Sequence, residues 1–229
     1  MQKPTTILRR RERKMLVERA ELSWIRSLVR LHPAAFCVAY PARVVNNIYF
    51  DTLNFDCFRE GIDGLSQRCK TRMRWYGDLA GIVEPVIQQK RRDNLDSFKD
   101  EYLLAQILIG SEVEWKETLA QIIRAPNPLS KQIQLGLAPT LINQYKRDYL
   151  VSACERFRLT IDYGLKYFDQ NASSRINITR SVPSQAYLII ELKYDPAHDT
   201  IAHDILNWFP FRMTRSSKYK TGLLGGLPH

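Results

Sequence analysis

Charged residues recur at every second position in five separate stretches of this chain, and most of these charges are basic. The stretches are 10–14, 68–74, 88–92, 156–162 and 191–193. Because successive side chains of a strand point to opposite faces, each stretch gathers its charges on one face of a sheet. In the strand predicted around the second stretch, 67–76, the other face carries apolar residues that favour burial. The pattern therefore predicts strands with one packed face and one basic face.

For a single strand, a basic face exposed to solvent would be a sufficient explanation. Several such strands in one chain favour a cavity, because a large sheet often curls or closes. The charged face also lacks the mixture of lysine and glutamate that is typical of solvated surfaces. We therefore predict a barrel whose interior is lined by Arg, Lys and a few Glu side chains.

Such an interior suits a highly charged anion bound together with a divalent metal. Arginine binds phosphate oxygens with two parallel hydrogen bonds, and lysine acts as a point charge. Carboxylates such as Glu191 and Glu12 would hold Mg²⁺ or Mn²⁺, which bridges phosphate oxygens.

The overall composition agrees with an anionic partner. The chain of 229 residues has 34 Lys and Arg against 24 Asp and Glu, a net charge of +10, and is 45% hydrophobic. Its pI is about 9.5. These values are compatible with a packed core and favour nucleic acid, phosphate-rich small molecules, polyanions or an anionic membrane surface as partners.

The cysteines and the apolar runs indicate a cytoplasmic protein. The four cysteines are scattered, with no CxxC pair and no histidine at zinc-ligand spacing, which is typical of reduced thiols. No apolar run reaches the roughly 18 residues that span a bilayer, and the N-terminus does not resemble a signal peptide.

The order of the predicted elements favours an α+β fold with a largely antiparallel sheet. We predict one domain over 1–229, with a helical insertion at 100–136 and a flexible glycine-rich tail at 220–229. The predicted strands are 7–17, 44–52, 67–76, 83–92, 140–152, 155–165 and 186–194. The predicted helices are 18–31, 101–109, 112–124 and 199–208.

Short motifs along the chain, taken in order, resemble those of the VTC domain. They are Arg10-x-Glu12-x-Lys14, the run 47–52, Arg72-Met73-Arg74-Trp75-Tyr76-Gly77, the run 88–92, Tyr145-Lys146-Arg147, the run 158–162, Glu191-Leu192-Lys193 and Ser217-Lys218-Tyr219. The VTC domain is the polyphosphate polymerase domain of the vacuolar transporter chaperone complex. It belongs to the triphosphate tunnel metalloenzyme superfamily.

The resemblance implies an antiparallel β-barrel tunnel with helices packed outside it. It implies a metal-dependent phosphotransferase that moves the γ-phosphate of ATP to a growing polyphosphate chain, with Mn²⁺ or Mg²⁺. The residues that would contact phosphate and carry catalysis are Lys14, Arg72, Arg74, Lys90, Arg147, Arg158 and Lys218. Further phosphate contacts are expected from Arg10, Lys70, Arg92, Lys193, Ser217 and Tyr145. Glu191 and Glu12 are the expected metal ligands.

Two positions depart from the family pattern. Family members commonly have a glutamate where this chain has Gln88, and a neutral amide binds a divalent metal more weakly than a carboxylate does. The Lys-x-Arg run that often follows the third strand is represented by Lys99-Asp100-Glu101. These changes favour reduced catalysis with phosphate binding retained.

Four functions remain open at this point. They are a polyphosphate polymerase, a module that binds polyphosphate, inositol phosphates or nucleotides without turnover, a tunnel triphosphatase, and a nucleic-acid binder that uses an open sheet face. The resemblance favours ATP and polyphosphate as ligands, with no nucleic acid. The chain shows no SPX-like domain and no membrane helix, so we expect a membrane-protein partner to be another chain, with this protein peripheral to the cytoplasmic face.

Overall fold

The computed structural model describes residues 2–7, 10–18, 21–93, 96–124, 127–171, 173–183 and 186–225. Its centre is a long antiparallel sheet of ten strands in the order β1-β7-β6-β4-β3-β9-β10-β11-β2-β12. The strands are β1 (Gln2–Ile7), β2 (Arg11–Glu18), β3 (Cys37–Asp51), β4 (Gln67–Tyr76), β6 (Val86–Asp93), β7 (Asp96–Leu103), β9 (Ala138–Val151), β10 (Arg158–Asp169), β11 (Tyr187–Tyr194) and β12 (Met213–Thr214). Two short strands, β5 (Gly81–Val83) and β8 (Ile107–Ile109), pair with each other apart from this sheet.

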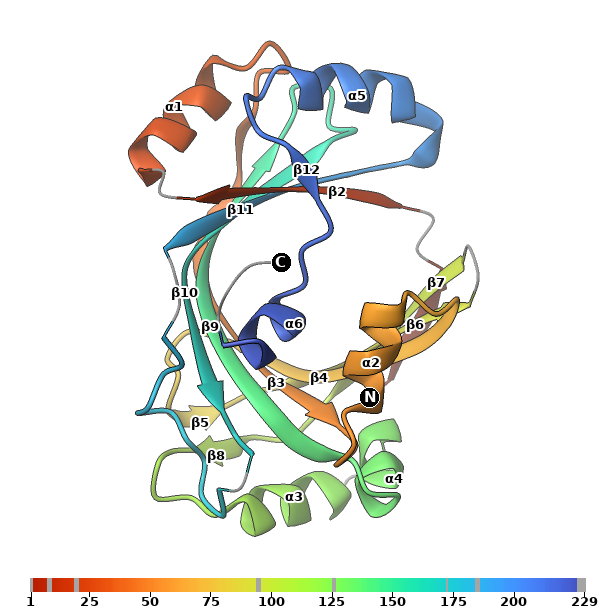
Figure 1. Cartoon of the computed structure of the whole chain (residues 1–229), viewed down its shortest axis with the longest axis vertical. Helices are drawn as coiled ribbons and strands as arrows, with labels where there is room; N and C mark the ends of the chain where they lie inside the picture. The colour runs from red at the N-terminus through yellow and green to blue at the C-terminus, as the bar shows by residue number, and fades with distance from the viewer. Residues whose placement is uncertain are drawn as a thin grey trace.

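The sheet curls strongly, as Figure 1 shows, and its strands enclose a concave face. β1 pairs with β7 at one end of the sheet, whereas β2, the next strand in the sequence, pairs with β11 and β12 at the other end. Lys90 of β6 also reaches Glu12 of β2 at 3.3 Å. The antiparallel sheet is confirmed, but it is not a closed barrel, because β1 and β12 remain its two edges in the described part of the chain.

Helices cover the outer, convex face of this sheet. They are α1 (Leu22–Leu31), α3 (Trp115–Arg124), α4 (Pro128–Gln134) and α5 (Asp199–Asn207), the last preceded by a 3₁₀ turn at Pro196–His198. One apolar cluster joins α1 and α5 to β2, β10 and β11 through residues such as Ile25, Ile161 and Ile190. A second joins α3 and α4 to β3, β4 and β6 through residues such as Met73 and Ile122. The alternation is therefore confirmed for the strands that carry it, because the apolar sides of β4, β10 and β11 pack under helices.

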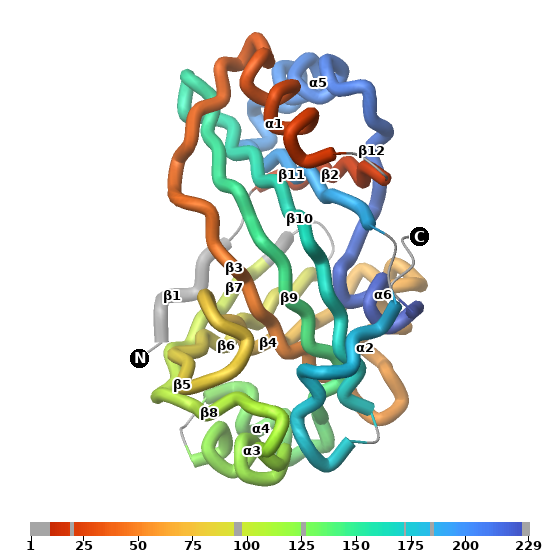
Figure 2. Tube along the Cα trace, turned by 90° about the vertical axis from the view of Figure 1, so that its left-hand side faces the viewer, coloured from red at the N-terminus to blue at the C-terminus, as the bar shows by residue number. Residues whose placement is uncertain are grey.

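Helix α6 (Lys218–Leu223) lies on the concave side, close to α2 (Asp56–Asp63), as Figures 1 and 2 show. Tyr219 stacks on Tyr49 of β3 with ring centroids 4.9 Å apart, and its hydroxyl donates to Asp51 at 2.6 Å. Gly222 packs so closely that a Cβ there would collide with Leu141 and Tyr167. Residues 220–223 are thus a packed helix and not the predicted flexible tail, and residues 226–229 lie outside the described part.

Several predicted elements have different boundaries, and one has the wrong type. The predicted helix at 101–109 is wrong, because Glu101 pairs with Gln88 on β6 and Ile107–Ile109 pairs with β5. The predicted insertion at 100–136 is therefore helical only from Trp115 onward. The strand predicted at 7–17 is two strands, β1 and β2. β3 begins at Cys37, before the predicted start, and its first residues are largely exposed.

Candidate functional site

Charged side chains from both halves of the sheet meet on the concave face. Register places them side by side: Arg72 lies opposite Gln88, Gln88 opposite Glu101, and Glu191 opposite Lys14. The basic side chains on this face are Lys14, Lys70, Arg72, Arg74, Lys90, Lys99, Arg147 and Lys193, joined by Lys218 of α6. The carboxylates among them are Glu12, Glu101, Asp162 and Glu191.

Four cations on this face hydrogen-bond only to neutral groups, and we call them the open cations: Lys14, Lys70, Arg72 and Arg74. Arg72 donates to the Gln88 amide oxygen at 2.9 Å. Arg74 donates to the Asn47 amide oxygen at 2.7 Å and to the Tyr145 hydroxyl at 3.2 Å. Lys70 donates to Ser217 Oγ at 3.4 Å, and Lys14 donates to the Ser216 carbonyl oxygen at 3.1 Å. Among the described residues, no carboxylate lies within ion-pair distance of these four.

Lys70, Arg72 and Arg74 are buried or half-buried without a carboxylate at ion-pair distance, which opposes folding. Lys14 differs from them, because Glu191 and Glu12 outweigh the effect of burial and raise its pKa. Burial and the neighbouring Lys220 ammonium lower the pKa of Lys70 to about 8. Burial, together with the Arg74 guanidinium, also lowers the pKa of Arg72. Both pKa values are lowered because burial and neighbouring positive charge disfavour the protonated side chains. An anion bound at this part of the face would offset that positive charge.

The cations on β9 and α6 have carboxylate partners, and with these partners they form what we call the paired cluster: Arg147, Asp162, Lys218 and Glu191. Arg147 donates two hydrogen bonds to Asp162, at 2.5 and 2.7 Å, and lies 3.8 Å from Glu191. Lys218 approaches the same Asp162 carboxylate at 2.5 Å.

The pKa values of the paired cluster follow from these contacts. Burial alone would raise the pKa of Asp162, but Arg147 and Lys218 outweigh it and hold the pKa at about 2. Burial also opposes ionisation of Glu191, yet Lys193 and Lys14 hold its pKa well below the usual range. The two carboxylates of the paired cluster are therefore ionised at neutral pH.

Tyr145 lies between the open cations and the paired cluster. Its hydroxyl accepts from Arg74, while the Lys218 ammonium lies 4.6 Å and the Arg147 guanidinium 5.3 Å from its ring centroid. Burial would raise the pKa of this phenol, but Arg74 and Arg147 outweigh burial and lower the pKa to about 8. The positive charge on both sides of Tyr145 therefore favours the ionised form of its phenol.

Gln88 links a cation to a carboxylate on the next strand. Its amide oxygen accepts from Arg72, and its amide nitrogen donates to Glu101 Oε1 at 2.6 Å. Lys99 pairs with the same Glu101 at 2.7 Å. A carboxylate at position 88 would face the Glu101 carboxylate at hydrogen-bond distance, so a neutral amide is compatible with Glu101 in a way that glutamate is not.

Two carboxylates of the concave face, Glu12 and Glu191, approach the same Lys193 ammonium. Glu12 lies 3.9 Å and Glu191 3.6 Å from the Lys193 ammonium. Within the described part of the chain, no group of three or more His, Cys, Asp or Glu side chains could enclose a metal. Mg²⁺ commonly needs only one or two carboxylates and takes its other ligands from water and phosphate. Glu12 and Glu191 therefore fit a metal that is held jointly with a phosphate ligand.

The structure brings most of the predicted site residues together, with some at the margin. Lys90 pairs with Glu12 at the open side of the curl, and Ser217 is the N-terminal cap residue of α6. Glu12 and Lys90 are exposed, and so are three further predicted residues: Arg10 precedes β2, Arg92 lies near the end of β6, and Arg158 is the first residue of β10.

Sequence reasoning missed Asp162, Lys99 and Glu101 as members of the site. Asp162 has the same parity as Arg158 and Thr160, so alternation along that strand was a signal for it. Lys99 and Glu101 also alternate, but the helix predicted at 101–109 concealed that pattern.

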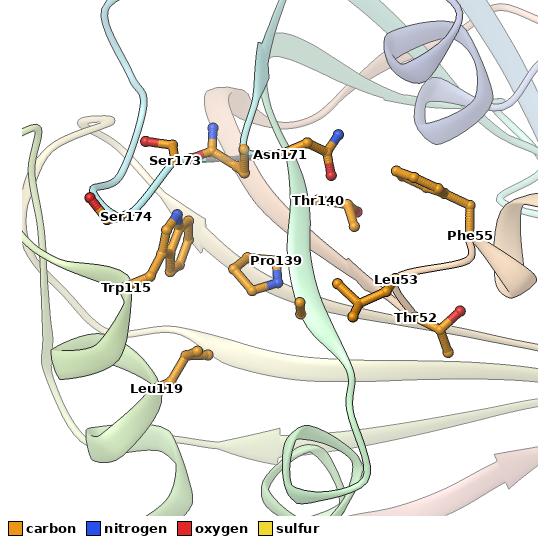
Figure 3. A pocket seen from close by; sticks show the side chains of 12 residues that line it. Thr52, Leu53, Phe55, Trp115, Leu119, Pro139, Thr140, Asn171, Ser173 and Ser174 are labelled. Carbon is orange, nitrogen blue, oxygen red and sulfur yellow. The ribbon is translucent and has the colours of Figure 1, made fainter.

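A separate hollow of about 620 Å³ lies between the β3–α2 turn, β9 and α3 (Figure 3). Its walls include Leu53, Phe55, Trp115 and Pro139. None of the described side chains that line it is charged. It is therefore distinct in chemistry from the concave face and is a poor candidate for a phosphate site.

The VTC domain family model matches residues 9–224, which is nearly the whole chain. The chain belongs to the VTC domain family. No curated protein matches the sequence. None of the helices in the described ranges is long and apolar enough to cross a bilayer.

Solved structures with the same fold are remote in sequence. A candidate adenylate cyclase from Bacillus halodurans has a TM-score of 0.55 and 15% identity, covering 90% of this chain and 92% of that one. A candidate adenylyl cyclase from Hippeastrum, described as having a dominant triphosphatase activity, has a TM-score of 0.51 and 14% identity, covering 95% of this chain and 97% of that one. The VTC domain described here thus has the triphosphate tunnel fold, with its sheet left open.

Proposed function

We propose that this VTC domain binds the phosphates of ATP and polyphosphate on its concave face and transfers the γ-phosphate of ATP to the polyphosphate chain. The observation that carries the proposal is the set of open cations. Burying a cation without a counter-charge is unfavourable, and several such cations on one face are stabilised when an anion of high charge density binds. A triphosphate group offers that charge in a linear arrangement that a row of strand side chains can follow.

Phosphoryl transfer depends mainly on positioning and on stabilising charge. A terminal oxygen of the polyphosphate chain attacks the γ-phosphorus of ATP in line. A new P–O–P bond forms, the bond from the γ-phosphorus to the bridging oxygen breaks, and ADP leaves with that oxygen. Arg72 and Arg74 would neutralise the equatorial oxygens during this step.

The paired cluster has a different part in this proposal. Asp162 holds Arg147 and Lys218 in fixed positions, so both cations are oriented before the ligand arrives. Glu12 and Glu191 would hold Mg²⁺ or Mn²⁺, which supplies further charge neutralisation at the phosphate oxygens.

A triphosphatase is the second candidate, because water in place of the polyphosphate oxygen would give hydrolysis on the same site. The fold similarity to the Hippeastrum protein, with its triphosphatase activity, favours this alternative. In either case ATP or another triphosphate is the ligand. A membrane partner would be a separate chain, with this domain peripheral to the cytoplasmic face.

The test is incubation of the purified protein with ATP and Mn²⁺, with separate measurement of long-chain polyphosphate, ADP and inorganic phosphate. Long-chain polyphosphate is expected, with one ADP formed for each phosphate added to the chain. Release of inorganic phosphate would support the triphosphatase instead. Tight polyphosphate binding with no turnover would leave a binding module and rule out both enzymes. The Arg72→Gln/Arg74→Gln variant is the control for activity from contaminants.

A further inference from the structure

An aromatic cluster continues the concave face beyond the phosphate-binding cations. Tyr76 is the next residue on the same face of β4 after Arg74, and Tyr149 follows Arg147 in the same way on β9. Arg43 of β3 lies directly opposite Arg147, and Tyr40 lies opposite Tyr149. Register therefore places Tyr40, Arg43, Tyr76 and Tyr149 together, and we call them the aromatic platform.

Contacts within the aromatic platform fix its members relative to one another. The Arg43 guanidinium lies 5.6 Å from the Tyr76 ring centroid and 5.9 Å from that of Tyr40. Tyr40 and Tyr149 meet edge to face at 6.1 Å. Arg147 lies 6.0 Å from the Tyr149 centroid, so the aromatic platform is continuous with the paired cluster. Cation–π contacts of this kind hold a side chain in place without covering both faces of the ring.

The rings of the aromatic platform are unusually accessible for residues of a sheet face. Tyr40 is 57% exposed and Tyr76 is 48% exposed, whereas the adjacent Trp75, on the packed face of the same strand, is 1% exposed. Arg43 is also exposed. Single exposed aromatic residues are ordinary, but three tyrosines and an arginine gathered at one end of a basic face form a surface suited to a flat ligand.

We propose that the aromatic platform is a stacking site for the base of a nucleoside triphosphate whose phosphates lie on the open cations. This inference rests on the proposed function and specifies the substrate class of the same site. Residues on one face of a strand are separated by about 6.6 Å, so Tyr76 lies one such step beyond Arg74. A base on Tyr76 and Tyr40 would therefore be joined through its sugar to phosphates that reach Arg74 and Arg72.

Stacking on tyrosine and arginine uses the π-face that every base has, so it discriminates poorly among bases. The aromatic platform thus selects nucleotides over inorganic triphosphate without selecting adenine over guanine. It also assigns a direction to the bound nucleotide, with the base at the Tyr76 end of β4 and the terminal phosphate toward Lys70.

The experiment compares two probes, a non-hydrolysable ATP analogue and inorganic tripolyphosphate, by isothermal titration calorimetry. The Tyr40→Ala/Tyr76→Ala variant is expected to lose about tenfold in affinity for the analogue, with tripolyphosphate affinity changed by less than about twofold. Tyr76→Phe, which keeps the ring, is expected to retain nucleotide affinity. Trp24→Ala, an exposed aromatic on the far side of the sheet, is the matched control.

Two results would overturn the inference while leaving the proposed function in place. If the double variant keeps its affinity for the nucleotide analogue, the aromatic platform does not bind the base, although the phosphate site stands. If the double variant loses affinity for both probes equally, the tyrosines support the phosphate site and not a base. Absence of tripolyphosphate binding by the wild-type protein would instead refute the proposed function together with this inference.

Discussion

The paired cluster and the open cations lie on one concave face and contain the same types of basic residue, but their basic side chains have different partners. In the paired cluster, Arg147 and Lys218 share the buried Asp162 carboxylate. Among the open cations, Arg72 and Arg74 contact only amide and hydroxyl oxygens. Arg74 and Arg147 are both strand residues and both are 8% exposed, so burial alone does not distinguish the two regions. What distinguishes them is whether the protein supplies the counter-charge itself or leaves it to a ligand.

The paired cluster therefore contributes to stability as well as to the site, whereas the open cations contribute to binding alone. A buried cation with its partner contributes to a defined structure, and removing one member leaves an uncompensated charge. A buried cation without a partner opposes folding slightly and is stabilised when an anion binds. Substitutions in the two regions should therefore have opposite patterns of effect on stability and affinity.

The largest expected effect is on stability, from Asp162→Asn. This change leaves Arg147 and Lys218 without their carboxylate, and we expect it to lower the free energy of unfolding by about 3–5 kcal/mol. Urea denaturation at pH 7 measures this loss. Arg74→Gln, at similar depth among the open cations, is the control and should change stability by less than about 1 kcal/mol. Equal losses in the two variants would remove the distinction between the regions.

The next effect is on affinity, from Arg72→Ala and Arg74→Ala. Each charge-assisted contact contributes about 1.5–3 kcal/mol, so each variant should weaken tripolyphosphate binding by more than tenfold. Calorimetric titration at fixed salt checks this. Unchanged affinity in both variants would exclude a phosphate site built on β4.

A smaller effect is expected when the link between Gln88 and Glu101 is altered. Gln88→Glu gives Arg72 a carboxylate partner but also places two carboxylates at hydrogen-bond distance, and the repulsion between positions 88 and 101 should cost about 1 kcal/mol. Adding Glu101→Gln should restore most of that loss, since one carboxylate and one amide are present again. A double-mutant cycle on unfolding free energies measures the coupling, and additive effects would show that the two side chains do not interact.

The smallest effect is a pH dependence of binding. The pKa of Lys70 is lowered to about 8, so the free protein loses this charge as the pH rises through 8, and triphosphate affinity should fall by a few-fold between pH 7 and 9. In the unfolded chain Lys70 keeps its proton up to about pH 10.5. Between about pH 8 and 10.5 this group therefore makes the stability of the ligand-free protein rise with pH.

Two variants separate the groups that titrate near pH 8. Lys70→Gln should remove much of the pH dependence of affinity, and Tyr145→Phe should remove the part due to the tyrosine, whose pKa is also about 8. A wild-type affinity that stays constant from pH 7 to 9 would contradict this interpretation of Lys70.

Sequence alternation predicted the arrangement of the faces because it depends only on local geometry. Arg72 and Arg74 lie on the concave side and Met73 on the packed side, as parity requires. The same rule could not show which cations would find partners, because the Arg147–Asp162 contact depends on the register of two strands. It also could not show that the sheet stays open, since that depends on where β1 and β12 pair.

Errors arose where tertiary contacts outweigh local preference. The segment 101–109 has apolar spacing compatible with a helix, but pairing of β7 with β6 and of β8 with β5 makes it extended. The glycine-rich sequence after Lys220 is typical of a flexible tail, yet Gly222 is what allows α6 to approach Leu141 and Tyr167 closely. Because glycine has no side chain, Gly222 permits this close packing.

The central claim is that the open cations are reserved for a polyanion, and thermal unfolding with and without tripolyphosphate tests it most directly. At a ligand concentration about 100-fold above Kd, the wild-type protein should gain about 2.7 kcal/mol, seen as a clear rise in Tm. The Arg72→Gln/Arg74→Gln variant should fold in the absence of ligand and show little or no rise. A wild-type Tm that does not respond to tripolyphosphate, or an equal rise in the variant, would contradict the account.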